Sequence, residues 1–144
     1  MSKPYFIDSN IFIYSKGKEH PLKSPCINIL QKIYEGNILT ITNTEILQEI
    51  LYHFQSIKKI QIGIQLAKEV IRISYRILPV IEKDLSQALM LLEKYPKLGT
   101  RDAFHSATMI NNDIKEIIST DSLSDLFSEI TRIDPQIFKL KSNY

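Results

Sequence analysis

The sequence predicts an α/β fold, a three-layer α/β/α sandwich around a mostly parallel sheet of about five strands. Short apolar runs bounded by turn residues alternate along the chain with longer segments whose apolar residues recur every three or four positions. The length of 144 residues, with 44% hydrophobic and 24% charged residues, is typical of one soluble globular domain. We therefore expect residues 1–144 to form a single domain.

The elements follow from these patterns in chain order. Residues 5–7 predict a short buried strand that ends at Asp8, and a helical turn is expected after it. The Pro, Gly and charged residues of 15–25 predict an exposed loop. Further strands are expected at 38–42, 77–81, 115–120 and 130–133, with Pro79 favouring an edge position, and helices at 24–35, 43–57, 61–75, 82–95 and 101–111, with a short helix or turn at 122–127.

Composition excludes several classes of protein and site. Cys26 is the only cysteine, which rules out an internal disulfide and a thiolate-rich metal site. It lies at a predicted helix start, so we interpret it as a small apolar residue rather than a nucleophile. The net charge of +2 is too small to indicate nucleic-acid binding by itself. No apolar run reaches the ~18–20 residues of a membrane span, and the amino terminus lacks an export-signal pattern. We expect a cytoplasmic protein that does not bind membranes.

Two helix starts are expected from capping patterns. Thr42 with Glu45 three positions later fits a capping box, and Thr100 is placed to cap the helix that begins at Arg101. The cap explains Glu45 locally, whereas Glu49, one turn later on the same helix face, has no such role. Glu49 is therefore the preferred candidate for a site, and Glu45 stays open as the alternative.

Acidic residues gather where the predicted strands end. Asp8 ends the first strand, Glu49 lies in the helix after the second, Asp102 lies in the first turn of the helix before the fourth, and Asp121 follows the fourth. Ligands bind beyond the carboxyl ends of parallel strands, so these side chains are expected to meet there. Carboxylates held close together need a cation to stay ionised, and carboxylate oxygens favour Mg²⁺ or Mn²⁺. Such an ion would position a phosphodiester and lower the pKa of a bound water, so the chemistry expected here is that of a nuclease. His105 is interpreted as a packing or supporting residue rather than a ligand.

Four motifs in order carry a resemblance to a known family: Phe6-Ile7-Asp8-Ser9-Asn10, Glu45-Ile46-Leu47-Gln48-Glu49-Ile50-Leu51, Thr100-Arg101-Asp102-Ala103-Phe104-His105-Ser106-Ala107 and Ile118-Ser119-Thr120-Asp121. Together they closely resemble the PIN domain, in particular the PIN proteins that act as VapC-type toxin ribonucleases. The resemblance extends from Tyr5 to about Pro135, and the segment around Asp102 is its most specific part.

The resemblance implies a divalent-metal-dependent endoribonuclease that leaves a 5′-phosphate and a 3′-hydroxyl. It implies that four acids surround one or two Mg²⁺ or Mn²⁺ ions, and that three further residues orient ligands or water. It also implies a homodimer and a cognate antitoxin as partners, with RNA as the substrate. The acids are Asp8, Glu49, Asp102 and Asp121, and the supporting residues are Asn10, Thr120 and Asp125.

Two other functions compete with this one. An Asp after an apolar strand also opens sheets that carry an aspartyl-phosphate, but phosphatases of the haloacid-dehalogenase type would need a second Asp at the position of Asn10. The other alternative is a catalytically silent PIN-like module that binds RNA or a protein. An intact set of four acids favours the nuclease.

Residues outside the acidic set receive structural interpretations. The isoleucines at 60, 62 and 64 provide more apolar surface than one core face needs, so part of the helical pair at 43–57 and 61–75 is expected to be an interface. Four basic residues are interpreted as a solvated face rather than as phosphate contacts: Lys58, Lys59, Arg72 and Arg76.

Overall fold

A computed structural model of the chain describes residues 4–121 and 128–138, so the helix or turn expected at 122–127 lies outside the described residues. The described part contains one sheet of five strands in the order β3-β2-β1-β4-β5, and every neighbouring pair is parallel. The strands are β1 (Pro4–Ile7), β2 (Leu39–Asn43), β3 (Arg76–Leu78), β4 (Glu116–Ile118) and β5 (Thr131–Ile133). The predicted fold class is confirmed.

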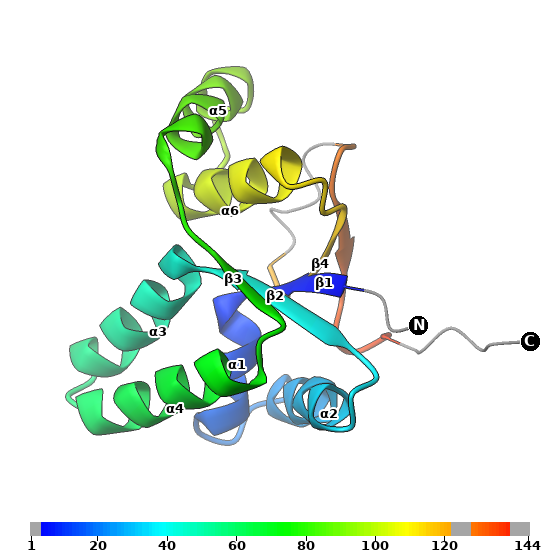
Figure 1. Ribbon diagram of the computed structural model, residues 1–144. Helices are drawn as coiled ribbons and strands as arrows, with labels where there is room; N and C mark the ends of the chain where they lie inside the picture. Colours follow the sequence, from blue (N-terminus) through cyan, green and yellow to red (C-terminus); the bar gives the residue numbers. More distant parts are fainter. Residues whose placement is uncertain (1–3, 122–127, 139–144) are drawn as a thin grey trace, which may run out of the picture.

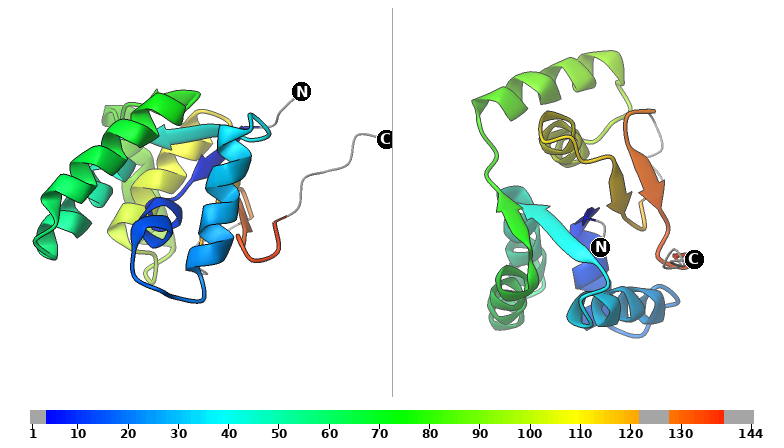
Figure 2. Two further views of the ribbon diagram at one scale, coloured as in Figure 1. Left: turned by 90° about the horizontal axis from the view of Figure 1, so that it is seen from below. Right: turned by 45° about the vertical axis from the view of Figure 1, so that its right-hand side comes forward.

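Helices cover both faces of this sheet. In the views of Figures 1 and 2, α5 and α6 lie on one side, and α1 to α4 lie on the other. The helices are α1 (Ser9–Lys16), α2 (Lys23–Tyr34), α3 (Thr44–Ser56), α4 (Ile60–Ile73), α5 (Glu82–Lys94) and α6 (Thr100–Asn111). No helix among residues 4–121 and 128–138 combines the length and the apolar character needed to cross a membrane.

The central strand β1 explains why a short apolar run can anchor the fold. Phe6 pairs with Ile41 of β2 on one side and with Ile117 of β4 on the other. Phe6 and Ile7 are fully buried, as expected of a parallel strand covered by helices on both faces. Their burial fixes the end of β1, and with it the place of Asp8.

The predicted helical turn after Asp8 is a helix of eight residues, so the loop predicted at 15–25 begins later, at Gly17. The Asp8 side chain caps this helix by accepting a hydrogen bond from the backbone N–H of Ser9 at 2.8 Å. Ile11 and Phe12 of this helix are fully buried. Capping and burial together stabilise α1 as far as Lys16, inside the segment 15–25 that was predicted to be a loop.

The capping box predicted from Thr42 and Glu45 is wrong. Thr42 is fully buried inside β2, and Asn43 is the N-cap of α3, where its Oδ1 accepts a hydrogen bond from the N–H of Ile46 at 2.9 Å. Thr100 is likewise not a cap, because it is the first residue of α6 and Gly99 occupies the cap position. Strand pairing extended β2 by one residue and moved the helix start with it.

The edge position predicted for the strand at 77–81 is confirmed, but the strand spans Arg76–Leu78 and Pro79 lies beyond its end. Strand β3 is the last strand on its side of the sheet, and it ends at Leu78. The α3–α4 pair packs closely, because a Cβ atom at Gly63 would lie 2.9 Å from the Cβ of Phe54. Ile62 is 43% exposed on this pair. An interface with another chain at α3–α4 stays a prediction.

Candidate active site

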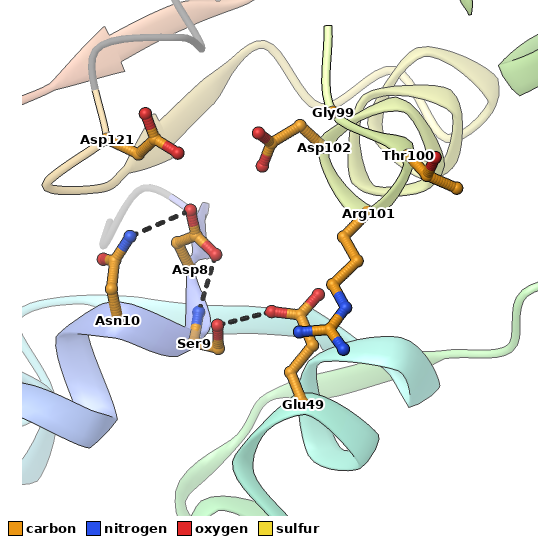
Figure 3. A pocket seen from close by; sticks show the side chains of 9 residues that line it. All are labelled: Asp8, Ser9, Asn10, Glu49, Gly99, Thr100, Arg101, Asp102 and Asp121. Atoms are coloured by element: carbon orange, nitrogen blue, oxygen red, sulfur yellow. Dashed lines mark hydrogen bonds between the residues drawn. The ribbon is translucent and has the colours of Figure 1, made fainter. Parts of the chain in front are cut away.

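A cavity of about 370 Å³ lies where the carboxyl end of β1 meets the starts of α1 and α6. All four acids expected from the sequence line it, and Figure 3 shows Asp102 and Asp121 facing Asp8 across the same space. Glu45 is half-buried and is absent from the lining. The lining residues are Asp8, Ser9, Asn10, Glu49, Gly99, Thr100, Arg101, Asp102 and Asp121.

Asp8 is held by three hydrogen bonds. Its Oδ1 accepts from the N–H of Ser9, and its Oδ2 accepts from the Ser119 hydroxyl at 2.7 Å and from the Asn10 amide at 3.3 Å. The carboxyl is 4% exposed, and burial raises its pKa above the usual range even though His105 and these donors act against the shift. Asp8 is therefore fixed in place and costly to ionise without a nearby positive charge.

Asn10 and Ser119 join the end of β1 to the segment after β4. The Asn10 amide also donates to Ser119 at 3.2 Å, and its carbonyl accepts from the backbone N–H of Thr120 at 3.2 Å. The Ser119 hydroxyl in turn accepts from the backbone N–H of Asp121 at 3.0 Å. Thr120 thus contributes its backbone to the network. Ser119, which sequence reasoning missed, contributes the hydroxyl. The strand was expected to run over 115–120, whereas β4 ends at Ile118 and leaves Ser119 just beyond it.

Glu49 lies on the buried stripe of α3, between the fully buried Ile46 and Ile50. Its Oε2 accepts from the Ser9 hydroxyl and its Oε1 contacts His105 Nε2, each at 2.5 Å. Burial by itself raises the pKa of Glu49, but the hydrogen bond and charge of His105, the hydrogen bond from Ser9 and the charge of Arg101 together lower the pKa below the usual range. Glu49 is therefore ionised at neutral pH.

His105 is oriented by Asn43, the N-cap residue of α3. The Asn43 carbonyl accepts from the N–H of Ile46, so its amide nitrogen faces His105 Nδ1 at 3.2 Å and Thr108 Oγ1 at 3.1 Å. Thr108 donates its own proton to the carbonyl of Phe104, which leaves its oxygen to accept from Asn43. His105 Nδ1 therefore accepts a hydrogen bond, and Nε2–H donates to Glu49.

This tautomer bears on which atoms can bind a metal. Among the described residues, Asp8, Glu49 and His105 offer ligand atoms within 4.8 Å of one another. Burial lowers the pKa of His105, and the bond to Glu49 together with the charge of Asp8 raises it overall, while the Asn43 donor opposes a proton on Nδ1. In either protonation state Nε2 carries a hydrogen. The carboxylates are therefore the available ligands, and His105 orients one of them.

Asp102 completes the acidic wall from the first turn of α6. Burial raises its pKa to about 6, and the charges of Asp8 and Asp121 add to the shift. Burial and repulsion from the neighbouring carboxylates both disfavour the ionised form of Asp102. A divalent cation in the cavity would remove that repulsion, and oxygen donors of this kind suit Mg²⁺ or Mn²⁺.

The remaining residues expected at the site have different positions. Asp125 lies outside the described residues, and the four basic residues interpreted as a solvated face are absent from the cavity lining. The cation that does line the cavity is Arg101, whose guanidinium carbon lies 5.3 Å from the centre of the Tyr52 ring. Sequence reasoning missed both residues. Both could have been found from their closeness in sequence to the predicted acids, since Arg101 directly precedes Asp102 and Tyr52 follows Glu49 by about one helical turn.

Comparison with known families places most of the described chain in one of them. The family model described as "PIN domain" matches residues 5–131. The chain belongs to the PIN domain family. Ribonuclease VapC13 of Mycobacterium tuberculosis is 34% identical to this PIN-domain protein over 128 residues, covering 88% of this chain and 97% of VapC13. The family resemblance predicted from the four motifs is confirmed.

Solved structures share the fold of this PIN-domain protein. FitAcB from Neisseria gonorrhoeae matches with a TM-score of 0.71 at 12% identity, covering 93% of this chain and 99% of that one. VapC20 of M. tuberculosis, a toxin that cleaves the sarcin-ricin loop, matches with a TM-score of 0.67 at 16% identity, covering 88% and 98%. The PIN architecture is thus retained where little sequence identity remains.

Proposed function

We propose that this chain is a divalent-metal-dependent endoribonuclease and the toxin of a toxin–antitoxin pair. The observation that carries the proposal is the convergence of four carboxylates on one cavity in a chain of the PIN family. Relatives named as ribonucleases match nearly their whole length, which supports the activity, and solved toxin–antitoxin complexes of the same fold support the biological role. A cognate antitoxin and a second copy of this chain are the proposed protein partners.

We infer that Mg²⁺ or Mn²⁺ is the cofactor and that Asp8, Glu49, Asp102 and Asp121 hold it. The fit rests on the donor set, which is made of carboxylate oxygens, and on the raised pKa values of Asp8 and Asp102, which a cation would relieve. A bound divalent ion supplies a positive charge for the phosphodiester and lowers the pKa of water. The proposal thus includes the presence of one or two divalent ions and their identity as Mg²⁺ or Mn²⁺.

The chain's own residues prepare this site before substrate arrives. Ser119 and Asn10 fix Asp8, while Ser9 and His105 fix Glu49, so neither carboxylate has to reorient during the reaction. Asp102, with a pKa of about 6, gains or loses its proton close to neutral pH. These residues bind and orient, and the phosphodiester of RNA is the proposed bond that is hydrolysed.

Separate substitutions of Glu45 and Glu49 test this function. Glu49→Gln is expected to lower RNA cleavage at least about a hundredfold, because it removes a charge from the proposed metal site. Glu45→Gln is expected to stay within about twofold of the parent, since Glu45 is outside the cavity lining. The measurement is the rate of cleavage of total RNA by purified protein with Mg²⁺ or Mn²⁺.

A chelator supplies the control in the same assay. EDTA should stop cleavage by the parent and by Glu45→Gln, and added Mn²⁺ should restore it. Cleavage that survives EDTA would contradict the metal-dependent nuclease, and equal loss in both variants would contradict the placement of the site at Glu49.

Asp102 leads to a prediction about stability and pH. Its folded-state pKa of about 6 exceeds its ordinary value of 3.8, so the folded metal-free protein binds that proton more tightly than the unfolded chain. The resulting stabilisation is complete below about pH 4 and is lost as the pH rises through about 6. In EDTA, Asp102→Asn is therefore expected to melt at a higher temperature than the parent at pH 7, and at the same temperature at pH 4.

Thermal unfolding followed by circular dichroism measures this difference. Mn²⁺ at pH 7 should raise the Tm of the parent and leave that of Asp102→Asn nearly unchanged. A variant that is less stable than the parent in EDTA at pH 7 would show that repulsion among the acids is absent.

A further inference from the structure

Arg101 lies at the mouth of the acidic cavity. It is the only Lys or Arg among the described residues that line the cavity, where it faces four carboxylates. The residue belongs to the first turn of α6 and is exposed, and Figure 3 shows its side chain extending from α6 toward Glu49 on α3. A guanidinium in this position can bind the phosphate groups of a nucleic acid, which the carboxylates would otherwise repel.

Tyr52 lies beside this guanidinium on α3. The Arg101 guanidinium carbon is 5.3 Å from the centre of the Tyr52 ring, within the range of a cation–π contact. Tyr52 follows Glu49 by three positions, so it lies about one turn along the same side of the helix. Its side chain is 57% exposed. The ring therefore keeps surface available for contact with a ligand at the edge of the cavity.

The hydrogen-bonding groups of Arg101 are available as well. Within residues 4–121 and 128–138, the Arg101 side chain forms no hydrogen bond and no ion pair. It is not paired with Glu49 either, although its positive charge lowers the pKa of that carboxyl. Contact with an aromatic ring does not consume the five N–H donors of a guanidinium as a carboxylate would. Arg101 is thus oriented by Tyr52 and retains donors for a phosphate.

A second pair in the chain shows what a purely local contact looks like. Lys94 lies over the ring of Tyr95, also at 5.3 Å from its centre, but the two are sequence neighbours at the end of α5. Neither residue lines the acidic cavity. The Arg101–Tyr52 pair instead joins two helices that both contribute acids to the site.

We infer that Arg101 and Tyr52 form the substrate-binding edge of the site: Arg101 binds a phosphate of the RNA chain, and Tyr52 stacks on an unpaired base next to it. The inference rests on the ribonuclease function proposed above. It specifies a single-stranded segment as the substrate, because the bases of a duplex stack on one another and leave no face for an aromatic side chain.

Binding measurements in a non-cleaving background test the inference. The probe is a fluorescent single-stranded RNA of mixed sequence, with Asp8→Asn as the parent, Mg²⁺ present and the salt concentration varied. Arg101→Ala is expected to weaken binding about tenfold and to reduce the slope of log affinity against log salt by about 0.7, the value of one phosphate contact on a single strand. Tyr52→Leu is expected to weaken binding about tenfold with the slope unchanged.

Conservative and distant substitutions are the controls. Tyr52→Phe should bind as the parent does, since it keeps the stacking face, and Arg101→Lys should keep the salt slope of the parent because it keeps the charge. Lys94→Ala, which removes the cation of the matched pair outside the cavity, should change neither affinity nor slope. Binding of the same strand annealed to its complement should be insensitive to Tyr52→Leu.

The outcomes separate this inference from the proposed function. If the protein with Asp8 intact cleaves RNA but Arg101→Ala and Tyr52→Leu bind RNA as tightly as their Asp8→Asn parent does, the substrate-binding role is wrong and the nuclease stands. Equal losses on duplex and single strand would overturn the stacking role of Tyr52. If the intact protein cleaves no RNA with Mg²⁺ or Mn²⁺, the nuclease proposal fails and the inference fails with it.

Discussion

Replacing Asp8 by Asn is expected to reduce RNA cleavage more than about a hundredfold while leaving the fold intact. Asp8 is the acid at the centre of the hydrogen-bond network, and loss even of residues that merely orient metal ligands typically costs ten- to a hundredfold. The amide retains an oxygen for the N–H of Ser9, so the cap of α1 survives. Initial cleavage rates with Mg²⁺, measured beside circular dichroism spectra, provide the test.

The matched control is Asp113→Asn, in the turn that follows α6. Asp113 has a φ of 56°, a conformation that Asn accepts readily, and it lies outside the acidic cavity. This variant should cleave RNA at the rate of the parent. Full activity in Asp8→Asn, or an equal loss in Asp113→Asn, would remove Asp8 from the proposed site.

The largest expected effect on stability comes from Asn43→Ala. The Asn43 side chain is fully buried, caps α3 through Ile46, and donates to both His105 and Thr108. Loss of the cap and of these bonds is expected to lower the free energy of unfolding by about 2–4 kcal/mol, which lowers the Tm by about 5–15 °C. Urea and thermal unfolding of the purified variant measure both quantities.

Asn37→Ala serves as the comparison for this experiment. Asn37 makes one exposed side-chain hydrogen bond, to Glu35, and its removal should change the free energy of unfolding by less than about 0.5 kcal/mol. If Asn43→Ala were no less stable than Asn37→Ala, the buried network from Asn43 to Glu49 would not be a structural support of the site.

The layered fold was predictable because buried positions are filled by apolar residues, so the spacing of apolar residues along the sequence indicates which segments are strands and which are helices. Phe6 and Ile7 form the centre of the sheet as expected. Glu49 was preferred to Glu45 because Glu45 was assigned to a capping box, and the structure contradicts that assignment, since Asn43 caps α3. The structure adds a physical reason, since Glu49 occupies the buried stripe of α3 and requires partners there.

The parts that could not be predicted depend on contacts between distant segments. The start of α3 was misplaced because pairing with Ile77 of β3 keeps Thr42 inside β2, so Asn43 becomes the cap. Ser119 bonds to Asp8 only because β4 lies beside β1 in the sheet. The approach of Arg101 to Tyr52 depends on how α6 lies against α3, which a linear pattern does not specify.

The central claim is that four carboxylates from separate parts of the fold form one binding site for a divalent cation. The most direct test is a crystal structure grown with Mn²⁺, in which the anomalous signal locates the ion. We predict a peak within coordination distance, about 2 Å, of carboxylate oxygens from the set Asp8, Glu49, Asp102 and Asp121, with His105 Nε2 still bonded to Glu49. A peak ligated by His105 Nε2, or one that lies away from this cavity, would contradict the claim.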